Sequence, residues 1–274
     1  MYFVYMLKRY INYFIGGTKR MFAKLEEQLK AATRTIVFTE GTDARILDAA
    51  DKLTNQGILN VILIGEEGEV KKAAADGGFH IDKCQIVNPA AYDEMEPMVE
   101  EMLRLRKGKM TEEQVRSALS QGNYFGTMLV KMGKADCLLG GATYSTADTV
   151  RPALQLIKTK PGNKIVSSTF IMVKGDEKLA FADCAINIDP SEDDLVEIAI
   201  ESAKTAKVFG IDPKVAMLSY STLGSGKGES VTKMANATAK VKEQAPDLAI
   251  DGELQFDAAV SPEVAKIKCQ GSPV

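Results

Sequence analysis

The sequence predicts an α/β protein with two domains, each built on a largely parallel β-sheet covered by helices. From Met21 onward, short apolar runs alternate with amphipathic stretches of helical length. Most of these runs are apolar throughout, which is typical of parallel strands buried on both faces of a sheet. The length of 274 residues, with 45% hydrophobic and 26% charged residues, fits one large or two ordinary globular domains.

The first domain is predicted to span residues 21–160. Its strands are expected in TIVFTEG (35–41), NVILIG (60–65), CQIVNP (84–89) and ADCLLGG (135–141). Its helices are expected in FAKLEEQLKAA (22–32), TDARILDAADKLTNQG (42–57), EEGEVKKAAADGG (66–78), a charged stretch from Asp93 to Arg106, and two stretches beginning at Thr111 and Asn123. Thr42 or Asp43 is suited to cap the second of these helices, and TEEQ at Thr111 is a capping box.

The second domain is predicted to span residues 161–274, because the pattern changes near KTKPGN (158–163). IVSSTFIMVKGDEKLAFADCAINI (165–188) predicts two longer strands joined by the turn KGDEK, and such a hairpin is antiparallel. After it we expect a helix from Asp193 to Phe209, the strand VAMLSYS (215–221), a glycine-rich loop, the helix ESVTKMANATAKVKEQA (229–245) and the segment AIDGELQFDAAV (249–260).

Charge and cysteine content exclude several classes of function. The net charge is -3 and the chain has no basic block, which argues against general binding of nucleic acid or of an anionic membrane. The four cysteines are far apart in the sequence, so we expect free thiols and a cytoplasmic protein. The only histidine, His80, is expected to be structural or to face solvent. With one histidine and scattered cysteines, we expect no metal site.

Residues 1–20 differ from the rest of the chain, because charges at Lys8 and Arg9 interrupt their aromatic and apolar runs. The stretch is too short and too broken for a transmembrane helix, and it lacks a signal-peptide core with a cleavage site. We interpret it as a non-native upstream extension, with Met21 as the natural start. The intact mass of the natively expressed protein tests this interpretation.

The stretch GGATYSTADTVRPALQ (140–155) is the strongest candidate site. It follows an apolar strand, and ligands of doubly wound sheets bind beyond the carboxyl ends of the strands. Glycine amides, the hydroxyls of Ser145 and Thr146, and the guanidinium of Arg151 are suited to hold phosphate groups. In this interpretation Arg151 and Pro152 lie in the first turn of the following helix. In the alternative, the hydroxyls cap the helix and Arg151 pairs with Asp148.

A second glycine-rich stretch, STLGSGKGES (221–230), also lies between a strand and a helix. A P-loop requires a glycine, four further residues and then Gly-Lys-Ser or Gly-Lys-Thr. Here Gly228 follows Lys227, and the first position is Ser221, so the pattern fails twice. We interpret the stretch as a flexible strand-to-helix turn.

Taken together, several stretches resemble the phosphate acetyltransferases of the phosphate acetyl/butyryltransferase family. The stretches are EGTDARILDAA, LRKGKMTEEQ, NYFGTMLV, GGATYSTADTVRPALQLIKTKPG, FADCAINI and DGELQFDAA, and the resemblance covers residues 21–274 in order. It implies the reversible reaction of acetyl-CoA and phosphate to acetyl phosphate and CoA. It also implies two α/β domains similar to those of isocitrate and isopropylmalate dehydrogenases, with a cleft between them and a homodimer as the complete form.

The resemblance also assigns roles to particular residues. Arg106 and Arg151 match two arginines that serve the substrates in the family, with Arg104 as the rival of Arg106 if the alignment is shifted. It implies no cofactor, since CoA is a substrate, and no acyl-enzyme, because the CoA thiolate attacks the acetyl group directly. Cys184, which lies within FADCAINI, is the cysteine of most interest, and we interpret it as a buried strand thiol.

Family chains continue beyond the position that matches Val274. In the family, that further segment supplies an oxyanion-stabilising serine, another phosphate-binding arginine and the proposed general base. We therefore expect no catalytic residue of these kinds within this chain, and weak or no turnover by the chain alone. Two alternatives remain open, namely a phosphate butyryltransferase and a non-catalytic fragment or partner of the same fold.

Overall fold

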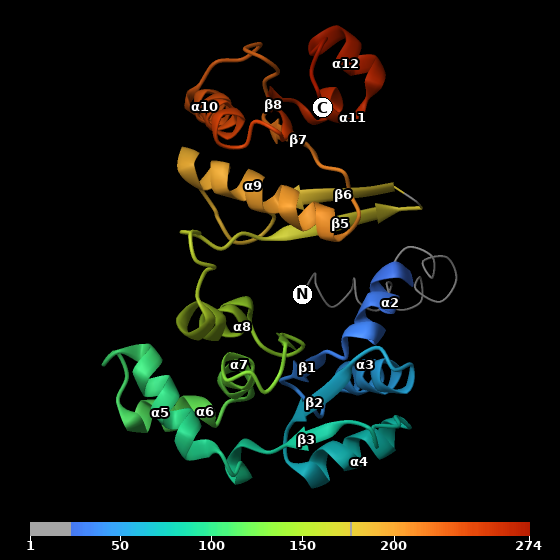
Figure 1. The fold of residues 1–274 in the computed structure, drawn as a ribbon, viewed down its shortest axis with the longest axis vertical. Helices are drawn as coiled ribbons and strands as arrows, with labels where there is room; N and C mark the ends of the chain where they lie inside the picture. The colour runs from blue at the N-terminus through green and yellow to red at the C-terminus, as the bar shows by residue number, and fades with distance from the viewer. Residues whose placement is uncertain (1–22, 176) are drawn as a thin grey trace. The chain divides into compact units, whose positions relative to one another are not determined.

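The structure is a computed structural model that describes residues 23–175 and 177–274 (Figure 1). The proposed upstream extension, residues 1–20, lies outside this part of the chain. The chain forms two compact units, which divide between Lys158 and Thr159. Each unit is described by itself below.

Unit 1 is built on a four-stranded sheet in the order β3-β2-β1-β4, and every neighbouring pair is parallel. The strands are β1 (Thr35–Phe38), β2 (Asn60–Ile64), β3 (Gln85–Val87) and β4 (Cys137–Leu139). Each lies within a segment that the apolar pattern predicts to be a strand. The strand pairing confirms the predicted parallel arrangement. Helices separate all consecutive strands, as the connection of parallel strands requires.

Helices cover both faces of this sheet (Figure 1). The helices of unit 1 are α2 (Ala23–Ala32), α3 (Ala44–Asn55), α4 (Glu67–Gly77), α5 (Met95–Arg106), α6 (Glu112–Leu119), α7 (Gly122–Lys131) and α8 (Thr146–Pro152), with the short turns η1 (Pro89–Ala91) and η2 (Ala153–Ile157). Successive residues of β2 point to opposite faces. Val61 and Leu63 pack with α3 and α4, whereas Ile62 and Ile64 pack with α5, α6 and α7.

The ends of these helices follow the local sequence. Asp43 caps α3 by accepting a hydrogen bond from the Arg45 amide at 2.9 Å. Thr111 and Gln114 form the predicted capping box of α6, with bonds of 3.2 and 2.9 Å. Gly78 adopts a left-handed conformation at the end of α4, which glycine does without a steric penalty.

Unit 2 contains two separate two-stranded sheets. Its elements are β5 (Thr169–Lys174), β6 (Glu177–Ala182), α9 (Glu192–Val208), β7 (Lys214–Leu218), α10 (Glu229–Gln244), β8 (Ala249–Leu254), α11 (Phe256–Val260) and α12 (Pro262–Lys268). The β5–β6 hairpin is antiparallel, as predicted, and α9 packs against it. The β7–β8 pair is parallel and packs against α10 (Figure 1).

The second strand of the hairpin is shorter than the sequence predicts. It ends at Ala182 instead of continuing to Ile188. The next residue, Asp183, accepts hydrogen bonds from the amides of Ala185, Ile186 and Asn187 at 2.9, 3.1 and 2.9 Å. A side chain that binds the amides just after it turns the backbone out of the extended conformation. Cys184 therefore lies half-buried in a loop and not in a strand.

Candidate functional site

The carboxyl ends of the adjacent strands β1 and β4 are the place in unit 1 where a ligand site is expected. The chain runs from β1 to β2 on one side and later returns to β4 on the other. In open parallel sheets, this reversal of strand order creates a ligand site at the carboxyl ends of the two strands. The segments that meet there are 39–41, after β1, and 140–143, after β4, which we call the β4 loop.

Glycines allow close packing at this edge. A Cβ atom on Gly140 would lie 2.5 Å from Thr39 Oγ1, and one on Gly122 would lie 2.6 Å from the Thr39 carbonyl oxygen. Gly122 is the first residue of α7, so α7 begins directly against the end of β1. A carbonyl oxygen belongs to the backbone and cannot rotate away as a side chain can.

We therefore expect Gly122→Ala to lower the free energy of unfolding by about 1–3 kcal/mol, as overpacking in a dense region does. Gly68→Ala is a matched control, because Gly68 also lies in the first turn of a helix, α4, and its nearest neighbour is the side chain of Glu66 at 3.1 Å. Alanine favours a helix over glycine by up to about 1 kcal/mol, so the control is expected to be neutral or stabilising. Urea unfolding of both variants measures the difference, and equal stability of the two would contradict the close packing.

Glu40 binds the β4 loop directly. Its side chain is buried, with 8% exposure. Its carboxylate accepts hydrogen bonds from the Gly141 amide at 3.2 Å, the Thr143 amide at 2.7 Å, the Thr143 hydroxyl at 3.1 Å and the Thr39 hydroxyl at 3.0 Å. The sequence interpretation offers the glycine amides to a phosphate. The structure corrects this for Gly141, whose amide is already occupied by an internal carboxylate.

The start of α8 also differs from the first sequence interpretation. Ser145 is the N-cap, accepting from the Asp148 amide at 3.1 Å and donating to the Asp148 carboxylate at 2.6 Å. Thr146 is the first helical residue and is exposed. Arg151 and Pro152 therefore lie in the last turn of α8, not in the first, because the helix begins as soon as Ser145 provides a cap.

Asn123 compensates for the proline within α8. Proline has no N–H group, so residue 152 cannot donate to the carbonyl of Asp148. The side-chain amide of Asn123, which is buried in α7, donates to that carbonyl at 2.7 Å instead. The chain then continues as the π-helical turn η2. Asn123 thus joins α7 to α8 at the point where the helix changes its geometry.

Arg151 is available to a ligand. Its side chain is 57% exposed, and Nη1 lies 3.7 Å from the Asp148 carboxylate. The pairing with Asp148, which is the alternative sequence interpretation, is therefore present, but an exposed pair at this distance contributes only about 0–1 kcal/mol. The guanidinium can exchange this partner for a phosphate at little cost.

Arg106 and Arg104 lie near the end of α5 in different surroundings. Arg104 is 70% exposed and donates to both carboxylate oxygens of Glu101, at 2.7 and 2.6 Å. Arg106 is half-buried, and its Nε atom is buried without a hydrogen-bond partner. Within the described residues, Arg106 takes part in no ion pair. A buried donor without a partner is uncommon in folded proteins, and a phosphate group could accept from this atom only after the side chain turned toward the ligand.

The structure therefore distributes the predicted residues over two neighbouring elements. Ser145, Thr146 and Arg151 belong to the start and the end of α8, and Arg106 ends α5. Helix α5 packs against η2, which directly follows α8. Helix α5 thus lies beside the turn that continues α8.

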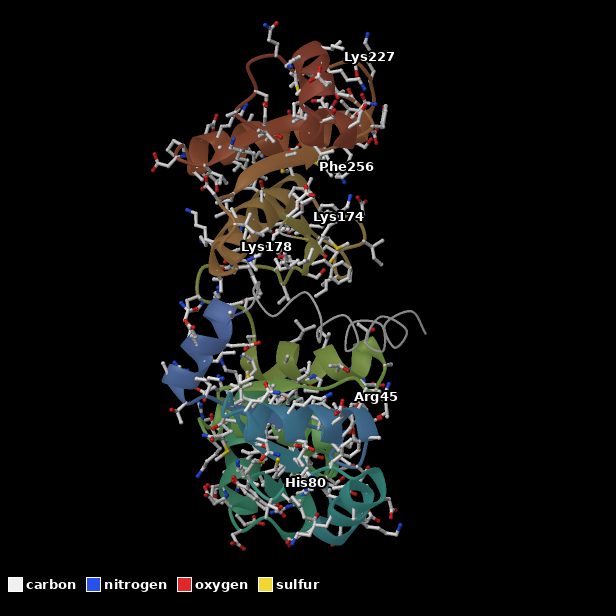
Figure 2. The ribbon with its side chains drawn as sticks, turned by 90° about the vertical axis from the view of Figure 1, so that its right-hand side faces the viewer. Arg45, His80, Lys174, Lys178, Lys227 and Phe256 are labelled. Atoms are coloured by element: carbon white, nitrogen blue, oxygen red, sulfur yellow. The ribbon has the colours of Figure 1, made fainter. Side chains whose placement is uncertain are left out.

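Arg45 is a site residue that the sequence interpretation missed (Figure 2). It lies in the first turn of α3 and donates from Nη2 to the Ala142 carbonyl at 2.8 Å. Its Nε and Nη2 atoms also bind both carboxylate oxygens of Asp43, at 2.9 and 2.6 Å, and these bonds hold the pKa of Asp43 below its usual range. The available signal was the stretch EGTDAR, whose charged residues directly follow a buried strand.

Unit 2 holds its glycine-rich turn in a similar way. Glu253 is buried and accepts from the Gly224 amide at 2.6 Å and the Ser221 hydroxyl at 3.0 Å. Burial would raise the pKa of Glu253, but these hydrogen bonds outweigh it and hold the pKa below its usual value. The turn joins β7 to α10, as predicted, and it is tied to β8 by this carboxylate. Lys227 remains exposed at its end (Figure 2).

The remaining candidate groups stand apart from these loops. His80 is exposed, as predicted, and only its backbone is bound, its amide donating to Asp51 at 3.0 Å (Figure 2). Across residues 23–175 and 177–274, no group of three or more His, Cys, Asp or Glu side chains is placed to hold a metal ion. None of the helices in this same part of the chain is both long enough and apolar enough to cross a bilayer.

Comparison with known families decides the affiliation of the chain. The model of the phosphate acetyl/butaryl transferase family matches residues 20–274. The chain belongs to the phosphate acetyl/butyryl transferase family. A family member from Bacillus subtilis (strain 168), named phosphate acetyltransferase, is 52% identical over 254 residues, which are 93% of this chain and 79% of that protein. One from Staphylococcus aureus (strain MRSA252) with the same name is 47% identical over 252 residues, 90% of this chain and 77% of that protein.

Solved structures of the phosphate acetyl/butyryl transferase family have the same fold. A phosphotransacetylase from Streptococcus pyogenes is 49% identical, with a TM-score of 0.89 over 93% of this chain and 78% of that chain. A phosphotransacetylase from Staphylococcus aureus is 45% identical, with a TM-score of 0.87 over 94% of this chain and 79% of that chain. The predicted α/β fold class and the predicted resemblance are both confirmed, and the chain is an acyltransferase by family.

Proposed function

We propose that the chain transfers an acetyl group reversibly between coenzyme A and inorganic phosphate. The observation that carries this proposal is the identity of 52% to a phosphate acetyltransferase over 93% of the chain. The arrangement of unit 1 supports it independently. A sheet edge of the kind that binds anionic ligands is followed by a helix with an exposed arginine, Arg151, and the last residue of α5, Arg106, has a buried donor without a partner.

In the direction of acetyl-CoA synthesis, the CoA thiol first gives its proton to water, because the thiolate is the nucleophile. A bond forms between the thiolate sulfur and the acetyl carbon, and the bond from that carbon to the phosphate oxygen breaks. The phosphate leaves with the bonding electron pair. Both substrates carry phosphate groups, so guanidinium groups are suited to bind them and to stabilise the negative charge on the leaving phosphate.

We assign Arg151 and Arg106 to the phosphate groups of CoA or acetyl phosphate. Thr146, exposed at the start of α8, is proposed as a further donor to a phosphate oxygen. Ser145 is the weaker candidate of the pair, because its hydroxyl already serves Asp148 as donor and acceptor. Its proposed contribution is to fix the position at which α8 begins.

The cysteines support direct transfer without an acyl-enzyme. Cys269 is buried, Cys84 and Cys184 are half-buried, and Cys137 is exposed in β4, where burial of the thiol nevertheless raises its pKa. Burial raises the pKa of the Cys84 thiol, which lowers the fraction of reactive thiolate at neutral pH. No cysteine lies in the β4 loop or in α8, so the proposed reaction needs no thiol of the protein. CoA acts as a substrate, and we propose no other cofactor.

We also propose that the protein is a cytoplasmic homodimer. Free cysteines favour a reducing compartment. Unit 2 exposes large apolar side chains on its hairpin, including Phe170 and Phe181, and on α11, where Phe256 is exposed (Figure 2). Phe181 and Phe256 form an edge-to-face pair with ring centres 6.0 Å apart. Such groups of exposed apolar residues are typical of association surfaces, and the mass in solution, measured by light scattering, tests this part.

The activity is tested with purified protein from a host that lacks its own phosphate acetyltransferase. We expect CoA and acetyl phosphate both to bind, turnover by this chain to be weak or absent, and any breakdown of acetyl phosphate in the presence of arsenate to depend on CoA. Butyryl phosphate in place of acetyl phosphate tests the second family activity, and each added methylene changes discrimination by about 1–3 kcal/mol. Binding of neither substrate, or breakdown that is independent of CoA, would contradict the proposed function.

A further inference from the structure

Glu40 and Arg45 hold a loop that belongs to another part of the sequence. Glu40 lies two residues beyond the end of β1 at Phe38, and its carboxylate reaches the loop after the neighbouring strand β4. Arg45 reaches the same loop from the first turn of α3. The residues that they bind are about 100 positions further along the chain, so this contact exists only because β1 and β4 are adjacent.

One peptide group is bound at both of its ends. The N–H of Thr143 donates to Glu40 at 2.7 Å, and the carbonyl of Ala142 accepts from Arg45 at 2.8 Å. These two atoms belong to the same planar peptide unit. The N–H of Gly141, which belongs to the peptide unit two positions earlier, also donates to Glu40 at 3.2 Å. Rotation of the loop at residues 141–143 would break several of these bonds at once.

The carboxylate of Glu40 is fully hydrogen-bonded within the protein. Its four donors are two backbone amides and two hydroxyls. A buried carboxylate requires such donors, because removing it from water without them is strongly unfavourable. The pairing is therefore mutual. The loop satisfies Glu40, and Glu40 excludes conformations of the loop in which these amides turn elsewhere.

The bound loop leads directly into α8. Only Tyr144 separates Thr143 from the N-cap Ser145. The direction of α8, and with it the position of Arg151 in its last turn, is therefore set by where residues 141–143 are held. Neither Glu40 nor Arg45 needs to touch a substrate to influence binding by this route.

We propose that Glu40 and Arg45 are positioning residues for acyl transfer, which fix the β4 loop so that α8 presents Arg151 to the phosphate groups of the substrate. The effect on substrate binding rests on the proposed function. The effect on the loop itself does not, and it is measured on the protein without ligand.

The first experiment measures amide hydrogen exchange by NMR in Glu40→Gln, in which one carboxylate acceptor becomes an NH₂ donor. We expect exchange of the Gly141 and Thr143 amides to rise by about tenfold or more, as losing a hydrogen bond to a charged group implies. Glu253→Gln is the matched control, because Glu253 is also a buried carboxylate that holds a loop amide, that of Gly224. It is expected to change exchange at Gly224 and not at Gly141 or Thr143.

Arg45→Ala provides an independent variant if Glu40→Gln does not fold. The Arg45 side chain is 34% exposed, so its removal leaves no large cavity. Because Arg45 binds the carbonyl of the peptide group that carries the Thr143 amide, we expect faster exchange at Thr143 in this variant too. Unchanged exchange at Thr143 in Arg45→Ala, or at both amides in Glu40→Gln, would overturn the proposal.

The second experiment asks whether Glu40 acts through Arg151. The dissociation constant of CoA is measured for the parent chain, Glu40→Gln, Arg151→Ala and the double variant. If Glu40 only positions Arg151, Glu40→Gln weakens binding in the parent chain but changes it little once Arg151 is gone. Losses that multiply in the double variant would overturn the positioning role. If the parent chain binds neither CoA nor acetyl phosphate, the proposed function fails, and amide exchange alone decides whether Glu40 and Arg45 order the loop.

Discussion

Replacing Arg151 by alanine is expected to weaken binding of CoA or acetyl phosphate by about tenfold or more, and to leave the stability of unit 1 nearly unchanged. A hydrogen bond to a charged group contributes about 1.5–3 kcal/mol, which corresponds to this loss of affinity. In the free protein, Arg151 is 57% exposed and only 3.7 Å from Asp148. Its removal therefore breaks no strong contact of the fold.

The measurement is titration calorimetry with each substrate, together with urea unfolding of the same variants. Arg151→Lys keeps the charge but not the two-pronged geometry of the guanidinium, so we expect an intermediate affinity. Arg106→Ala is expected to behave like Arg151→Ala. Arg104→Ala is the control, because this exposed side chain is already engaged by Glu101. An effect of Arg104→Ala without one of Arg106→Ala would show that the two arginines have been assigned the wrong way round.

Asp183→Asn is expected to lower the free energy of unfolding of unit 2 by about 3 kcal/mol at neutral pH. The carboxylate binds three backbone amides of residues 185–187, the hydroxyl of Ser168 and the side-chain amide of Asn187. Burial alone would raise the pKa of Asp183, but these hydrogen bonds outweigh it and hold the pKa well below its usual range. Charge-assisted bonds of this kind are among the stronger ones in proteins.

The direction of the shift fixes the pH dependence. Because the pKa of Asp183 is lower in the folded protein than the value of about 3.9 in the unfolded chain, its contribution is fully present above pH 5. The contribution falls as the pH decreases through about 4 toward the folded pKa. The Asn variant cannot lose it, so the difference in stability between the parent chain and Asp183→Asn should shrink on acidification.

Urea unfolding followed by circular dichroism at pH 7, 5 and 3.5 measures this difference. Asp189→Asn is the control, because its carboxylate is exposed and pairs with Lys233 at the surface, and it should have little effect. A difference between the parent chain and Asp183→Asn that stays constant over this pH range would contradict the role given to the ionised carboxylate.

The sequence by itself determined the class of fold and most local features. Continuous apolar runs separated by amphipathic stretches sufficed for the parallel sheet of unit 1. The caps at Asp43 and Thr111 were predictable because a capping side chain binds amides only two or three residues away. The family was predictable from the motifs, because the motifs and their order can be read from the sequence without knowing the fold. The turn at Asp183 is also local, because its side chain binds amides two to four residues later. The apolar residues after Asp183 nevertheless suggested a longer strand.

Only the tertiary structure decided how the candidate site is held together. The sequence shows that Glu40 and Gly141 each follow a strand, but not that these strands are neighbours, so the bond between them was not predicted. The same stretch offers several possible N-caps, and the structure selects Ser145. That choice moves Arg151 from the first turn of α8 to the last. A helix start depends on where its preceding loop is fixed, and here residues about 100 positions away fix it.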